Sequence, residues 1–88
     1  MLHSDKFQET TIIIDGKEYK MEYDVSQAME KSIRGFGNIY IDEEEPMQFT
    51  FFTIDNKIAA YTPMNGTKDF ISNIVETATG HKFPFSDL

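Results

Sequence analysis

Cysteine is absent from this 88-residue chain, which excludes disulfides, thiolate metal sites and cysteine nucleophiles. Small secreted domains usually depend on disulfides, so the absence favours the cytoplasm. The first residues lack the apolar stretch of a signal peptide. No apolar run approaches the roughly 20 residues that span a bilayer. We therefore expect a cytoplasmic protein with no membrane segment.

Basic residues are scarce: eight Lys and Arg stand against fifteen Asp and Glu, for a net charge of −7. Binding to phosphate backbones requires clustered Lys and Arg, so we expect no direct contact with nucleic acid. Anionic membranes are disfavoured for the same reason. Aromatic side chains can stack nucleobases, but such sites interleave them with cations, and no cation lies between Arg34 and Lys57.

Catalytic and metal-binding patterns are also missing. The two histidines, His3 and His81, are far apart, and neither belongs to a Ser-His-Asp set or a metal-binding spacing. Fifteen acids offer many carboxylate pairs, but a catalytic pair must face a cleft at about 5–9 Å, and a chain this short has little volume for one. We expect no enzyme activity, no catalytic residues, no metal and no cofactor.

The size and composition indicate one globular domain over residues 1–88. Hydrophobic residues make up 40% of the chain and aromatic residues 14%, which is enough for one core. Residues 1–6 and 81–88 are expected to be loose tails. For Phe83 and Phe85 two fates remain open, packing back on the core or presenting a short docking motif.

The N-terminal third predicts a β-hairpin. Asp15-Gly16 separates two β-rich runs, and this dipeptide favours a type I′ turn. With a two-residue loop, Ile12 would face Tyr19 and Thr10 would face Met21. Alternation then gives one buried and one exposed face.

A helix is predicted next, opening at Asp24 or Ser26 and ending at Gly35. Its apolar stripe, at helical spacing, comprises Val25, Ala28, Met29, Ile33 and Phe36. Strands are expected at 38–41, 49–54 and 57–62, with turns at 42–46 and at Asp55-Asn56. A second helix is expected to begin at Asn65 or Thr67 and to end at Gly80, and its stripe comprises Phe70, Ile71, Ile74, Val75 and Ala78.

The resulting order is ββαβββα, an α+β fold with a mostly antiparallel sheet and two helices packed on it. Strand 49–54 has large apolar side chains on both faces, because Phe49 and Phe51 alternate with Phe52. That pattern suits a strand covered on both sides, or one whose second face docks a partner. The predicted core contains Ile12, Ile14, Tyr19, Met21, Ala28, Met29, Ile33, Ile39, Ile41, Phe49, Phe51, Ile58, Ala60, Phe70, Ile71, Ile74 and Val75.

The acidic residues are concentrated in the window 42–56, which has five acids and no Lys or Arg. They are Asp42, Glu43, Glu44, Glu45 and Asp55. The window also contains the whole of the predicted aromatic strand 49–54. An apolar centre with a charged rim is typical of a protein interface, and a negative patch speeds encounter with a basic surface. A charged turn that is merely solvated explains the same acids.

The leading functional hypothesis is a small acidic, non-enzymatic protein-binding module. It would inhibit or neutralise a basic protein surface, such as a nuclease or toxin, in the manner of immunity or phage anti-defence proteins. The five acids would supply charge, and Phe52 and Tyr61 would supply anchoring area. Two alternatives stay open: a structural or assembly protein forming a homo-oligomer through its sheet, and a domain that sequesters a small nucleotide-like ligand.

Overall fold

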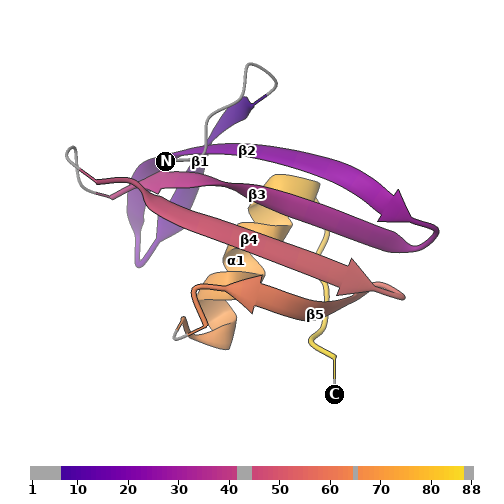
Figure 1. Ribbon diagram of the computed structural model, residues 1–88. Coiled ribbons are helices and arrows are strands. Elements are labelled where there is room, and N and C mark those ends of the chain that lie inside the picture. The colour runs from indigo at the N-terminus through magenta and orange to yellow at the C-terminus, as the bar shows by residue number, and fades with distance from the viewer. Residues whose placement is uncertain (1–6, 42–44, 65, 87–88) are drawn as a thin grey trace.

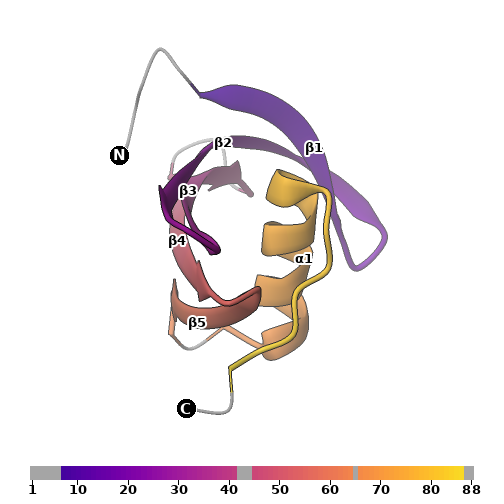
Figure 2. The ribbon, with the colours of Figure 1, turned by 90° about the vertical axis from the view of Figure 1, so that its right-hand side faces the viewer.

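The structure, a computed structural model, describes residues 7–41, 45–64 and 66–86. It is an α+β fold in which five antiparallel strands lie in the sheet in chain order and one helix follows them (Figure 1). The elements are β1 (Gln8–Ile14), β2 (Lys17–Met29), β3 (Ser32–Tyr40), β4 (Met47–Ile54), β5 (Lys57–Thr62) and α1 (Lys68–Thr79). The sheet curls around α1, which fills its concave side (Figure 2).

The N-terminal hairpin is confirmed, including its register. Asp15 and Gly16 have φ angles of 52° and 81°, the positive values that a type I′ turn requires at both positions. Ile12 pairs with Tyr19 and Thr10 pairs with Met21. The turn at Asp55-Asn56 follows the same rule, with φ angles of 51° and 64°.

The helix predicted from Asp24 or Ser26 to Gly35 is wrong, and with it the order ββαβββα. These residues form the second half of β2, a turn at Glu30-Lys31 and the start of β3. Lys31 takes a φ of 61° in that turn. Gly or Asn usually occupies this conformation, and neither is present at Glu30-Lys31 to indicate the turn. Pairing of β3 with both β2 and β4 outweighs the local helical pattern, and it extends the predicted strand 38–41 back to Ser32.

Gly35 and Gly37 do not stop a helix; they make room on the concave face of β3. A Cβ atom on Gly37 would overlap the backbone carbonyl of Glu22, and one on Gly35 would overlap the ring of Phe51. Strand glycines often mark such close approach. Here they allow the backbone of β2 and the ring of Phe51 to approach β3 closely.

The core lies between the concave face and α1. Its buried hydrophobic members are Ile12, Met21, Ile39, Phe49, Phe51, Ile58, Ile71, Ile74, Val75 and Phe83. Of the predicted core, Ala28, Met29, Ile41 and Ala60 are instead exposed. Ala28 lies at the irregularity in β2 between Gln27 and Met29, Ile41 lies just beyond β3, and Ala60 faces away from α1.

The second predicted helix is confirmed as α1. Thr67 caps its start by accepting a hydrogen bond from the Phe70 amide at 3.1 Å, and Gly80 ends it in the left-handed conformation. Within the described residues, no helix has the length and apolar character that crossing a membrane requires.

The segment after α1 packs back on the molecule. The amide of Ile58 donates to the Pro84 carbonyl at 2.8 Å, and the amide of Ser86 donates to the Ile58 carbonyl at 2.9 Å. Phe83 is buried in the core and Phe85 packs against it. These contacts answer the question left open for the two phenylalanines: both are used in packing.

Candidate functional site

The face of the sheet that points away from α1, called the outer face here, carries the candidate site. Residues directly opposite each other on neighbouring strands share a face, so the register defines its rows. One row comprises Asp24, Phe36, Thr50 and Thr62; the next comprises Ser26, Arg34, Phe52 and Ala60; a third contains Met29, Ser32 and Ile54. Phenylalanines in two adjoining rows give this face an apolar centre.

A groove of about 660 Å³ crosses the outer face over β3, β4 and β5. Its lining comprises Arg34, Gly35, Phe36, Thr50, Phe51, Phe52, Ala60, Tyr61 and Thr62. We call it the outer-face groove. Its volume falls within the range of roughly 300–1,000 Å³ that is usual for ligand pockets, and its mostly apolar lining is also usual.

Among the described residues, Arg34 is the one charged side chain lining this groove. Its side chain is exposed and forms no ion pair with any described residue. The ion pair that the described residues do form joins Lys20 to Glu9, at 3.2 Å. The hydroxyls of Thr50 and Thr62 lie 2.7 Å apart on the same face. The lining therefore combines one cation, the phenylalanines Phe36, Phe51 and Phe52, and the hydroxyl-bearing residues Thr50, Tyr61 and Thr62.

A second polar group on the outer face, the Glu22 cluster, consists of Glu22, Asn38 and Tyr40. Asn38 Nδ2 donates to Glu22 Oε1 at 3.1 Å, and the Tyr40 hydroxyl donates to the same oxygen. The hydrogen bond to Glu22 raises the pKa of Tyr40; burial and the negative charges of Glu22 and Glu9 raise it further. Because two donors already engage this carboxylate, the cluster joins β2 to β3 rather than offering a reactive group.

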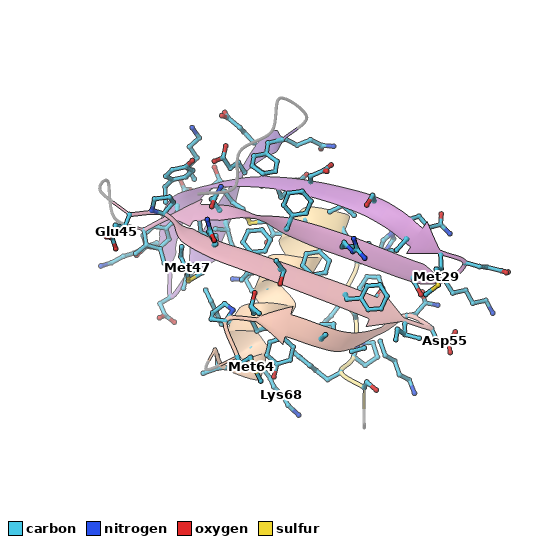
Figure 3. All side chains as sticks on the ribbon, viewed as in Figure 1. Met29, Glu45, Met47, Asp55, Met64 and Lys68 are labelled. Atoms are coloured by element: carbon cyan, nitrogen blue, oxygen red, sulfur yellow. The ribbon has the colours of Figure 1, made fainter. Side chains whose placement is uncertain are left out.

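The predicted acidic patch is divided by the fold. Asp42, Glu43 and Glu44 lie outside the described residues. Glu45 and Asp55 are both exposed and lie at opposite ends of β4 (Figure 3). A strand of eight residues is about 26 Å long, so Asp55 is remote from Glu45.

Asp55 lies instead beside the β2–β3 turn, since its amide donates to the Lys31 carbonyl at 3.0 Å. Lys57 follows it closely in the chain. Charges of both signs therefore meet at this end of the sheet. Glu45, at the opposite end of β4, lies in the connection between β3 and β4.

The two predicted anchors differ in their surroundings. Phe52 is half-buried on the outer face and lines the groove. Tyr61 is also half-buried and lines the groove at β5, but it pairs with Phe51, and its ring contacts Phe85 edge-on at 5.7 Å. Phe52 is consequently the better placed of the two to meet a partner.

Arg34 and Phe36 were missed by the sequence interpretation, because the predicted helix put Arg34 on its solvent side and Phe36 in its apolar stripe. The signal that identifies them is period-two alternation. Arg34, Phe36 and Tyr40 alternate with Gly35, Gly37 and Ile39 over residues 32–40, as in a strand.

Over the ranges 7–41, 45–64 and 66–86, no group of three or more His, Asp or Glu side chains is placed to hold a metal ion. Comparison of the chain with family models, with curated proteins and with solved structures found no match.

Proposed function

We propose that this chain is a non-enzymatic protein-binding module that neutralises a partner with a basic surface, such as a nuclease or toxin, and that the outer-face groove is its contact. One observation carries the proposal. The inner face of the sheet is covered by α1 and the C-terminal segment, whereas the outer face keeps Phe36 and Phe52 beside an open groove.

An antiparallel sheet usually turns polar residues toward water. Here Ile54 retains 46% of its exposure and Met29 retains 61%, both in the row next to Phe52. Among the described residues outside the sheet, Phe7 contacts this face, with its ring 5.6 Å from that of Phe36. Clustered apolar side chains around a hollow are typical of an interaction site.

The acids at the β3–β4 connection supply the long-range part of recognition. Glu45 is exposed there, and Asp42, Glu43 and Glu44 precede it in sequence. Glu45 precedes β4 by two residues, at the start of a strand that lines the groove. The four acids would raise the rate of encounter with a basic surface at low salt, and the groove would then supply the apolar contact.

The test is retention of host proteins on the immobilised chain at about 50 mM and 500 mM salt; the higher concentration shortens electrostatic range to roughly 4 Å. Ala60 is exposed inside the groove, and Ala59 is exposed next to it but does not line the groove. Ala60→Gln should abolish retention of the partner by filling the groove, and Ala59→Gln should not. The purified partner should lose its activity on binding the wild type.

A charge-reversal variant tests the contribution of the acidic residues. Glu43→Lys combined with Glu44→Lys should slow association by about tenfold or more at low salt and much less at high salt. Glu18→Lys with Glu76→Lys changes the net charge equally at exposed positions elsewhere and serves as the control. If all variants retained the partner equally, neither the groove nor the acidic residues Glu43 and Glu44 would be the contact.

Self-assembly is the second candidate, and one observation favours it. β1 is an edge strand of the sheet with the sequence QETTIII, which contains no proline or lysine to discourage pairing. A second copy could add to this edge and extend the sheet.

A further inference from the structure

Arg34 is the one arginine in this chain; the other seven basic residues are lysines. Acids outnumber bases by fifteen to eight, yet no carboxylate of the described residues lies within ion-pair distance of its guanidinium. On the outer face, Arg34 lies between Ser32 and Phe36 along β3. It is opposite Phe52 on β4 and Ser26 on β2, and Asp24 occupies the adjoining row of β2. An exposed guanidinium that forms no ion pair with any described residue is available to a partner.

The other lining groups limit what such a partner can be. β3 and β4 each have a paired strand on both sides, so their backbone amides are used within the sheet. Beyond the guanidinium, the side chains that offer polar groups are the hydroxyl-bearing Thr50, Tyr61 and Thr62. One planar cation among hydroxyl-bearing side chains suits a single carboxylate, which arginine can bind through two parallel hydrogen bonds.

We propose that the outer-face groove receives an Asp or Glu side chain of the partner protein, with its carboxylate on Arg34 and an adjoining aromatic residue of the partner on Phe36 and Phe52. This inference rests on the proposed function and specifies its contact. The partner would then be basic around the contact and acidic at its centre, the reverse of this chain's acidic surroundings and central cation.

A nucleotide is the competing occupant, since phenyl rings can stack a base. A phosphate dianion, however, is usually held by several N–H donors or a helix N-terminus. The described lining provides one guanidinium for it, on a chain with a net charge of −7. The acidic peptide segment is therefore the better match in charge.

The experiment is an NMR titration of the ¹⁵N-labelled chain with the matched peptides Ac-Glu-Phe-NH₂ and Ac-Gln-Phe-NH₂, up to about 10 mM. The glutamate peptide should bind at least about threefold more tightly, with shifts at residues 34–36, 50–52 and 60–62. Arg34→Gln should remove the preference and Arg34→Lys should retain part of it. Ala60→Gln should weaken both peptides, and Ala59→Gln should weaken neither.

Each other outcome overturns the inference. Equal binding of the two peptides would show that Arg34 does not recognise a carboxylate, and no binding of either would show that the groove takes no such segment. AMP binding more tightly than the glutamate peptide would assign the groove to a nucleotide.

The two proposals fail separately. If Ala60→Gln abolished retention of the host partner but Arg34→Gln bound it normally, the groove would remain the contact and only the carboxylate on Arg34 would be rejected. If retention of host proteins were unaffected by Ala60→Gln while the glutamate peptide still bound preferentially, the groove would bind a carboxylate but would not be the contact of the proposed function.

Discussion

At the residue scale, Glu22 shows how one buried acid organises part of a sheet. Only 6% of this residue is exposed, although it lies on the face that points away from α1. A buried carboxylate is costly unless hydrogen-bonded, and Asn38 and Tyr40 on β3 supply the donors. The three residues fix the pairing of β2 with β3, next to the groove but separate from it.

Tyr40 should make stability depend on alkaline pH. Its pKa is raised above the ordinary value of about 10, so the folded state favours the neutral phenol. That stabilisation is complete below pH 10 and is lost as the pH rises through the folded-state pKa. Tyr40→Phe should cost about 1–2 kcal/mol at pH 7, and the difference from wild type should shrink above pH 10.

Urea unfolding between pH 7 and pH 11 measures this effect. Tyr61→Phe is the control, since it leaves Tyr40 and Glu22 in place and should keep the wild-type dependence. A difference between wild type and Tyr40→Phe that is constant over this range would show that the hydrogen bond to Glu22 does not bias ionisation.

At the scale of elements, the C-terminal segment completes the core that the sheet and α1 leave open. Ile58 exchanges two backbone hydrogen bonds with it, so the segment covers part of the β5 edge. The Lys68 Nζ lies 5.4 Å from the centre of the Phe85 ring, which links the start of α1 to the same segment. β5 is therefore a protected edge where the segment covers it.

Phe83→Ala should destabilise the protein by about 3 kcal/mol, because it removes a buried ring and leaves a cavity. Phe85→Ala should cost less, since Phe85 is half-buried. Urea unfolding of both variants is the measurement. A Phe83→Ala variant within about 0.5 kcal/mol of wild type would show that the segment contributes little to the core.

At the scale of the whole molecule, net charge and the free β1 edge act in opposite directions. An exposed edge strand invites pairing with another copy, but a net charge of −7 on each chain opposes it. Asn73 on α1 also donates to the Ile13 carbonyl at 2.7 Å, which occupies one acceptor of the edge.

We therefore expect a monomer of 10.2 kDa in sedimentation equilibrium at concentrations up to about 100 µM. Asn73→Ala tests the protective contact, and any self-association that it permits should increase with salt as repulsion is screened. A wild-type dimer at low salt would instead favour the assembly function over the inhibitor function.

The parts of the fold that depend on local chemistry can be predicted from the amino-acid sequence alone. Asp15-Gly16 and Asp55-Asn56 adopt their turns because these residues tolerate positive φ, and Thr67 and Gly80 bound α1 because they satisfy its end groups. Alternation in β1 and β2 then set their register. The run of four acidic residues at 42–45 is likewise evident from the sequence.

Tertiary structure decided what depends on neighbours distant in the chain. Residues 24–36 carry a helical apolar stripe, but pairing of β3 on both sides and the space around Gly35 and Gly37 make them strand. That choice turned Arg34 and Phe36 onto the outer face beside Phe52. It also separated Asp55 from Glu45 along the length of β4. The candidate site exists because three strands lie side by side, an arrangement that no short segment of the chain encodes.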